Sequence, residues 1–248
     1  VGNSNVTIGV FAGETLQAQW RLKTNRDQTA DEWGVLLRNL FELEGLDRKS
    51  ISGVMIGSVV PSVDTPLANM ARRYFQTEAL FLSTAIRTGL TVRYDNPRDV
   101  GADRTANGVA AFHRYGGPCV VVDLGTAITF DAVSEDAEYL GGIISAGIGI
   151  SIQALFTRTA RLPMVDFRKP ARLVGTNTVD SMQSGIYYGT LGLIDGVLAR
   201  MIEELGPETR TVATGGQADL IMGASHYLKH FDEHLTLEGL RLVWEMNR

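Results

Sequence analysis

Cysteine is almost absent from this sequence, because Cys119 is its only example. A single thiol cannot form an internal disulfide, so a disulfide-stabilised secreted scaffold is excluded. Cys119 opens an apolar segment, where we expect it to act as a small buried side chain. The reducing cytoplasm is therefore the expected compartment.

Long apolar runs and an excess of positive charge are also missing. No segment approaches the roughly 20 consecutive apolar residues that span a bilayer. The first residues lack the charged leader and unbroken apolar stretch of a secretion signal. The 23 basic residues are outnumbered by 28 acidic ones, which gives a net charge of −5. Because phosphate backbones attract basic surfaces, neither nucleic acid nor a membrane is the expected partner.

Strand-like and helical segments alternate in both halves of the 248 residues, which indicates an α/β protein. Each half opens with apolar strands on either side of a tight turn, so we expect mixed sheets with flanking helices. The break at Gly116-Gly117-Pro118 separates an expected domain 1–116 from an expected domain 117–248.

The pattern places individual elements as well. Thr29-Ala30-Asp31-Glu32 has the form of a capping box that opens a helix, and Gly45 ends that helix. Strands are expected at 6–11, 16–22, 51–60, 80–82, 120–124, 127–133, 139–144 and 210–213. Further helices are expected at 66–75, 100–115, 149–160, 179–205, after 216 and at 235–246.

Two turns of similar composition stand out. Gly2-Asn3-Ser4-Asn5 follows Val1, and Asp123-Leu124-Gly125-Thr126 lies between two apolar strands. Such turns present backbone N–H groups to an anion, although plain hairpin turns favour the same residues. An uncompensated carboxylate at the end of an apolar strand costs roughly several kcal/mol, so Asp123 needs a cation or hydrogen-bond donors. Bonding of Asp123 to its own turn is the alternative. Two such tips facing each other would hold phosphates and a cation.

Two further glycine motifs begin helices. Gly101-Ala102-Asp103-Arg104 offers helix N–H groups and an arginine to an acidic ligand. Asp103 is either an N-terminal cap or a weak base, and a weak base suits phosphoryl transfer because positioning matters more than early deprotonation. Thr214-Gly215-Gly216 allows a flat ring or ribose to approach the backbone, or forms only a tight strand–helix turn.

Taken in order, these segments resemble the type III pantothenate kinases of the acetate and sugar kinase, chaperone and actin superfamily. The match runs from Val1-Gly2-Asn3-Ser4-Asn5 through Gly141-Gly142 to Leu235–Leu240. The resemblance implies two ribonuclease-H-like domains around a nucleotide cleft. It also implies ATP-dependent phosphorylation of pantothenate to 4'-phosphopantothenate, the first step of coenzyme A biosynthesis, by a homodimer.

The resemblance also implies roles for individual residues. Asp103 would accept the proton of the pantothenate hydroxyl, and Asp123 would hold a monovalent cation, K⁺ or NH₄⁺. Mg²⁺ would accompany ATP. Pantothenate would be bound by Tyr94, Gly101, Ala102, Asp103, Arg104 and Thr178, and ATP by Val1, Gly2, Asn3, Ser4, Asn5, Val6 and Thr126.

The sequence departs from the family pattern in two places. The family has an aspartate immediately before the residue that matches Val1, and we expect this residue to precede the printed sequence; its loss would impair magnesium–ATP binding. Ser145-Ala146-Gly147 replaces the usual Ala-Pro-Gly, which alters the stiffness of the loop. A non-catalytic ATP-binding regulatory or accessory protein is the alternative function. A sugar or acetate kinase is a third, although these lack the Gly101–Arg104 element. The presence of both Asp103 and Asp123 favours the pantothenate kinase.

Overall fold

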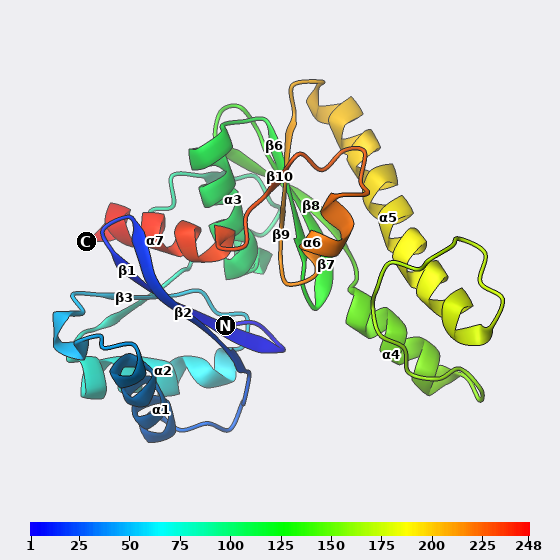
Figure 1. The fold of residues 1–248 in the computed structure, drawn as a ribbon. Coiled ribbons are helices and arrows are strands. Elements are labelled where there is room, and N and C mark those ends of the chain that lie inside the picture. Colours follow the sequence, from blue (N-terminus) through cyan, green and yellow to red (C-terminus); the bar gives the residue numbers. More distant parts are fainter. The chain divides into compact units, whose positions relative to one another are not determined.

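The computed structural model describes all 248 residues, which form two compact units (Figure 1). Unit 1 comprises Val1–Leu90, Tyr94–Ala110 and Thr236–Arg248, and unit 2 comprises Thr91–Arg93 and Ala111–Leu235. Helix α3 (Ala102–Tyr115) begins in unit 1 and ends in unit 2. The structural division thus lies a few residues before the expected domain boundary at 116, and the final segment of the chain returns to unit 1.

The strands of unit 1 form two separate pairs. β1 (Asn5–Ala12) and β2 (Thr15–Lys23) make an antiparallel hairpin, while β3 (Val54–Ile56) and β4 (Ala79–Phe81) are parallel. The expectation of one mixed sheet in this half therefore does not hold for the hydrogen-bonded strands of unit 1. The Gly2–Asn5 turn leads into β1, whose partner is β2.

The helices of unit 1 follow the sequence closely. α1 (Ala30–Leu43) opens with the expected capping box, in which the Glu32 carboxylate accepts a 2.8 Å bond from the Thr29 N–H. This bond lowers the pKa of Glu32. α2 (Asp64–Met70) continues as a π-helical segment through Ala71–Phe75, and α7 (Leu235–Asn247) closes the chain. Buried side chains of α1, α2 and the strands form one apolar core, which includes Trp33, Leu37, Phe41, Val63, Leu67 and Phe75.

Unit 2 contains a six-stranded mixed sheet, as the pattern of its half predicted. Its spatial order is β10-β9-β6-β7-β8-β5. The strands are β5 (Thr91–Val92), β6 (Cys119–Leu124), β7 (Ala127–Val133), β8 (Glu138–Ala146), β9 (Arg210–Thr214) and β10 (His230–Phe231). β6, β7 and β8 run antiparallel to their neighbours in sequence, whereas β9 is parallel to β6. The two-residue strands β5 and β10 are too short for an apolar pattern to predict.

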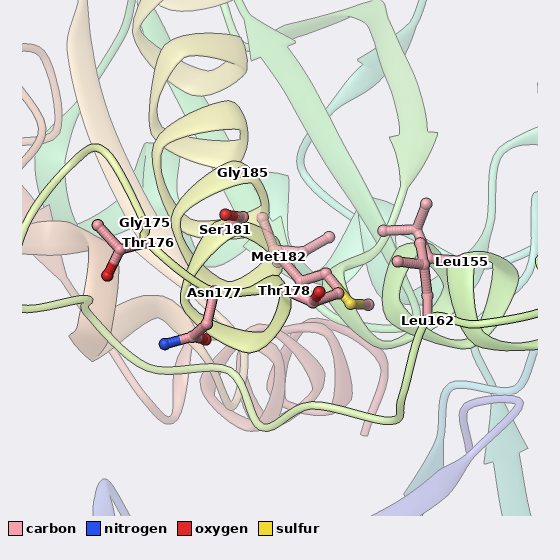
Figure 2. A pocket seen from close by; sticks show the side chains of 10 residues that line it. Leu155, Leu162, Gly175, Thr176, Asn177, Thr178, Ser181, Met182 and Gly185 are labelled. Carbon is pink, nitrogen blue, oxygen red and sulfur yellow. The ribbon is translucent and has the colours of Figure 1, made fainter.

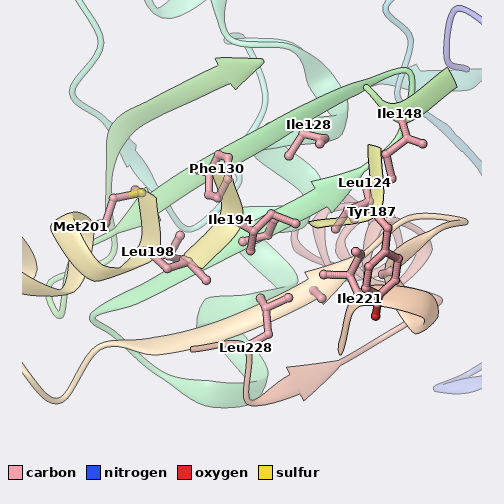
Figure 3. Close-up of a cluster of buried hydrophobic side chains, with 14 of the residues drawn as sticks. Leu124, Ile128, Phe130, Ile148, Tyr187, Ile194, Leu198, Met201, Ile221 and Leu228 are labelled. Atoms are coloured by element: carbon pink, nitrogen blue, oxygen red, sulfur yellow. The ribbon is translucent and has the colours of Figure 1, made fainter. Parts of the chain in front are cut away.

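One face of this sheet is covered by the helices of unit 2. They are α4 (Ile148–Arg158), α5 (Thr178–Leu205) and α6 (Ala218–Met222). Figure 3 shows Ile194 and Leu198 of α5 in the same cluster as Phe130 of β7. Full burial of each such side chain contributes roughly 1.5–3 kcal/mol, so the central strands are firmly held.

The buried face of β6 begins with the lone cysteine. Cys119 is fully buried, as expected, and burial raises the pKa of its thiol to about 12. The other end of the same strand carries Asp123.

Candidate active site

The turn that precedes β1, called here the tip (Val1–Val6), is closed by its own backbone and by the residue after β2. The Gly2 N–H donates to the Asn5 carbonyl at 2.9 Å. The Thr24 hydroxyl donates to the Gly2 carbonyl at 2.6 Å, and the Thr24 N–H donates to the Ser4 carbonyl at 3.0 Å. These three bonds are accepted by backbone carbonyl oxygens and fix the path of the loop.

Arg26 also reaches the tip, where its guanidinium donates to the Asn3 side-chain oxygen at 3.2 Å. A guanidinium beside a glycine-containing turn increases its attraction for phosphate. The sequence analysis missed both Thr24 and Arg26. The register of the β1–β2 hairpin explains their position: Asn5 pairs with Lys23, so the residues that follow Lys23 lie beside the tip.

The second element of unit 1 is the start of α3. Here the Arg104 N–H donates to Asp103 Oδ1 at 2.8 Å. A Cβ atom added to Gly101 would lie 2.6 Å from the same oxygen, so a larger residue here would require the Asp103 side chain to move. The Thr105 N–H donates to the Gly101 carbonyl at 3.1 Å and so closes the first turn. Asp103 is half-buried, and Arg104 is buried with 7% exposure.

The tip and the start of α3 come together at Val1. The carboxylates of Asp103 and Asp64 both lie close enough to the Val1 backbone nitrogen to interact with it electrostatically. Asp64 begins α2, and its Oδ1 atom is buried without a hydrogen-bond partner. The sequence analysis missed Asp64 because this position was interpreted only as the start of a helix. Unit 1 thus gathers two carboxylates beside the tip, and the half-buried Tyr94 belongs to the same unit.

In unit 2, Asp123 lies against two glycine-containing turns. A Cβ atom on Gly215, whose φ is +93°, would lie 2.6 Å from Asp123 Oδ1 and 2.7 Å from the backbone N and C atoms of Leu124. A Cβ atom on Gly125 would lie 3.4 Å from Oδ1. The carboxylate oxygen is therefore surrounded closely by backbone, a cradle that a larger residue at 215 would fill.

A third turn meets the same end of the sheet. A Cβ atom on Gly147 would lie 2.1 Å from the Thr126 carbonyl oxygen, so the β8–α4 turn packs directly on the β6–β7 turn. Thr126 itself is exposed. Glycine at 147 is retained even though Ser145-Ala146 departs from the family pattern. Three turns of unit 2 therefore converge beside Asp123.

Thr178 lies elsewhere in unit 2. Figure 2 shows it in a cavity of about 710 Å³, which is lined by Leu155, Leu162, Gly175, Thr176, Asn177, Thr178, Ser181, Met182, Gly185 and Ile186. Thr178 is the first residue of α5. The Asn177 side chain caps this helix by accepting a 2.9 Å hydrogen bond from the Asp180 N–H. The residues that line this cavity do not include Asp123, Gly125 or Gly215.

Two broader features were also searched for in the full chain. The structure contains no group of three or more histidine, cysteine, aspartate or glutamate side chains arranged to hold a metal ion. None of its helices combines the length and the apolar character that crossing a membrane requires.

Comparison with known proteins identifies close relatives. The sequence pattern of the family described as Type III pantothenate kinase matches residues 1–200. The Type III pantothenate kinase of Solibacter usitatus is 61% identical over 246 residues, which cover 99% of this chain and 94% of that protein. The protein of the same name from Koribacter versatilis is 53% identical and covers all of this chain and 94% of its own length.

Solved structures share the fold at much lower identity. A Baf family transcriptional activator from Campylobacter jejuni has a TM-score of 0.60 at 18% identity, covering 99% of this chain and 95% of that one. A ROK family glucokinase from Streptomyces griseus, solved with glucose and AMPPNP, has a TM-score of 0.56 at 11% identity, covering 99% and 97%. The fold is the mixed α/β fold of two ribonuclease-H-like domains found in the sugar kinases of this superfamily. The chain belongs to the type III pantothenate kinase family.

Proposed function

We propose that Asp103 accepts the proton in the reaction of this family, the ATP-dependent phosphorylation of pantothenate in coenzyme A biosynthesis. The observation that carries the proposal is the fixed position of the Asp103 carboxylate. One oxygen is held by the Arg104 N–H and packs on Gly101, and the carboxylate acts electrostatically on Val1 of the tip. A carboxylate fixed beside a phosphate-binding turn is suited to receive a hydroxyl proton as the phosphoryl group transfers.

In the proposed step, the pantothenate hydroxyl oxygen forms a bond to the γ-phosphorus of ATP. The bond from that phosphorus to the β–γ bridging oxygen breaks, and ADP leaves with its electron pair. The hydroxyl proton passes to Asp103. Gly101, Ala102 and Arg104 would bind pantothenate around this carboxylate. Tyr94 and Thr178 are further proposed pantothenate contacts. The buried guanidinium of Arg104 suits the carboxylate of pantothenate.

We further propose that the tip, Val1–Val6, binds the ATP phosphates, and that Thr126 contacts ATP. The closed backbone of the tip leaves Asn3 and Ser4 exposed for such contacts. Mg²⁺ would neutralise charge on the phosphates, and in phosphoryl-transfer sites it needs only one or two carboxylates besides them.

Asp123 is proposed to hold the monovalent cation, K⁺ or NH₄⁺. The cradle formed by Gly125 and Gly215 fits this group, because it presents a carboxylate oxygen among closely packed backbone atoms. Oxygen ligands of this kind suit hard cations.

The homodimer and the cytoplasmic location are proposals that rest on the family. Four exposed apolar side chains support a dimer: Ile143 and Ile144 on β8, and Ile150 and Phe156 on α4, with exposures of 42–62%. Exposed apolar side chains of this size are more frequent at interaction sites, although Ile143 and Ile144 project from opposite faces of β8. The domains 1–116 and 117–248 remain the proposed ribonuclease-H-like repeats.

The test is the variant Asp103→Asn, which keeps the oxygen that accepts from the Arg104 N–H and removes the base. We expect turnover in a coupled assay with pantothenate, ATP, Mg²⁺ and K⁺ to fall by about 10²–10⁴-fold. Asp99→Asn is the matched control, because Asp99 is an exposed carboxylate four residues earlier. Near-normal turnover of Asp103→Asn would remove Asp103 as the base. Binding of ATP by the unaltered protein with no release of ADP would instead favour a regulatory protein.

A further inference from the structure

A line of polar side chains leads away from Asp123 across the sheet of unit 2. In the antiparallel register of β6 and β7, Asp123 is paired with Thr129, and Val121 is paired with Asp131. Paired residues project from the same face of a sheet, with Cβ atoms roughly 4.5–5.5 Å apart. Thr129 and Asp131 are two residues apart on β7, so all three polar side chains share one face. The opposite face carries the apolar cluster that includes Ile128 and Phe130.

The hydrogen bonds along this line have a direction. The Thr129 hydroxyl donates to Asp131 Oδ2 at 3.0 Å, and the Tyr139 hydroxyl donates to Asp131 Oδ1 at 2.6 Å. Asp131 and Tyr139 are both fully buried. A hydroxyl has one proton and two lone pairs, so Thr129 has committed its proton to Asp131 and can only accept from any other group. The oxygen of Thr129 therefore presents electron density on the face that it shares with Asp123.

We propose that Thr129 is a second ligand of the monovalent cation and that Asp131 and Tyr139 are the residues that position it. This inference rests on the proposed function of Asp123 as the cation site. Asp131 holds the Thr129 proton away from the cation, and Tyr139 fixes the Asp131 carboxylate through its second oxygen. A cation between Asp123 and Thr129 then has one charged and one neutral oxygen ligand.

Packing alone does not account for a carboxylate at position 131. Its cross-strand partner Val121 and its neighbour on the same face, Val133, are both apolar and fully buried. Burial of a carboxylate among such residues is costly, even when hydroxyl groups donate to it. A carboxylate at this position can orient the Thr129 hydroxyl, which an apolar residue cannot do. The direction of these hydrogen bonds thus favours a role for Asp131 in orienting Thr129 beside Asp123, at the end of β6 and β7.

The test compares Thr129→Val, which keeps the shape of the side chain and removes its oxygen, with Thr129→Ser, which keeps the oxygen. The first measurement is the dependence of turnover on KCl, with tetramethylammonium chloride added to hold the ionic strength constant. The second is the rise of the thermal unfolding midpoint that KCl causes over tetramethylammonium chloride without substrates. We expect Thr129→Val to raise the half-saturating K⁺ concentration about tenfold or more and to lose most of the midpoint rise. Thr129→Ser should retain both.

Thr211→Val is the matched control, because Thr211 is a buried threonine of the same sheet that hydrogen-bonds the Tyr227 carbonyl. This variant should lower the midpoint in both salts and keep the K⁺ response. Tyr139→Phe should weaken the K⁺ response less than Thr129→Val does. A Thr129→Val protein with the K⁺ response of the unaltered protein would overturn the inference and leave the role of Asp123 intact. An unaltered protein with no K⁺ response would overturn both.

Discussion

Gly215 offers a way to perturb the cation site without changing a charged group. Its φ of +93° lies in the region that side chains rarely adopt, and its Cα faces the Asp123 carboxylate. In the variant Gly215→Ala, the new methyl group would lie 2.6 Å from Asp123 Oδ1 and 2.7 Å from the backbone of Leu124. The Leu124 side chain is buried with 1% exposure in a central strand, so its backbone cannot retreat. The carboxylate must therefore move, or the β9–α6 turn must.

The magnitude follows from two separate costs. An alanine held at positive φ costs about 1–3 kcal/mol. Forcing an extra methyl group into a packed site costs about 1–3 kcal/mol more. We therefore expect unit 2 to lose about 2–6 kcal/mol of unfolding free energy. For a domain of this size the loss corresponds to a fall of about 4–24 °C in the unfolding midpoint. Displacement of Asp123 should also raise the half-saturating concentration of K⁺.

The assay is thermal unfolding followed by circular dichroism, combined with the K⁺ dependence of turnover. Gly223→Ala is the control, because Gly223 ends the neighbouring helix at φ −69° and has no atom within 4 Å of its added Cβ. That variant should lie within about 0.5 kcal/mol of the unaltered protein. If Gly215→Ala has the same unfolding midpoint as Gly223→Ala and an unchanged K⁺ dependence of turnover, then Gly215 does not pack closely against Asp123.

Three other outcomes are expected. Burial raises the pKa of Cys119 from 9.0 to about 12, so the buried neutral thiol contributes its full stability below pH 9. That stability is lost at about 1.4 kcal/mol per pH unit as the pH rises from 9 towards 12. In urea unfolding between about pH 8 and 10.5, the variant Cys119→Ala should lack this loss of stability with pH. Ile144→Lys should convert the proposed dimer to a monomer in analytical ultracentrifugation, whereas Leu43→Lys, at an even more exposed apolar position, should not. Gly239→Ala should destabilise unit 1 by about 2 kcal/mol or more, because its Cβ would lie 1.9 Å from a backbone carbonyl oxygen of α3, whereas Gly192→Ala within α5 should stabilise the protein by about 0.5–1 kcal/mol in chemical denaturation.

Local patterns were sufficient to predict most elements of unit 2. The hairpin of β6 and β7, the strand β8 and the long helix α5 were all expected from apolar periodicity, and each exists within two or three residues of its expected bounds. These elements are long, and one face of each is buried in a single core. Short edge strands were missed, because β10 pairs only His230 and Phe231 with β9. A polar two-residue strand has no periodicity, and its position is decided by the neighbour to which it bonds.

Unit 1 was harder to predict because its organisation depends on contacts distant in sequence. The first turn was interpreted as the tip of a hairpin, but its partner is Thr24, beyond β2. The final helix, α7, was correctly located in the sequence, although nothing in its pattern assigns it to unit 1. Its placement depends on contacts such as the 2.7 Å bond from the Thr236 hydroxyl to Asn107 of α3. Such contacts are properties of the packed structure and have no local sequence signal.

The glycine motifs have a physical meaning that the sequence alone left open. They were interpreted as places where a ligand approaches the backbone, with tight turns as the alternative. The structure adds a third role, which is the same in both units: the glycine leaves room for a carboxylate oxygen. A Cβ atom on Gly101 would lie 2.6 Å from Asp103 Oδ1, and one on Gly215 would lie 2.6 Å from Asp123 Oδ1.

Each proposed functional carboxylate therefore packs against a glycine, and a larger residue there would force a shift. For Asp103 the glycine is Gly101, two residues earlier in the same motif, so both partners of the contact are adjacent in the sequence. For Asp123 the glycine lies at the end of the adjacent strand β9, where Thr214 pairs with Asp123, and only the parallel register brings the two together. A glycine at this position makes room for one oxygen of the carboxylate and so limits where that carboxylate can lie. Substitution of either glycine consequently tests the position of the carboxylate while its charge is kept.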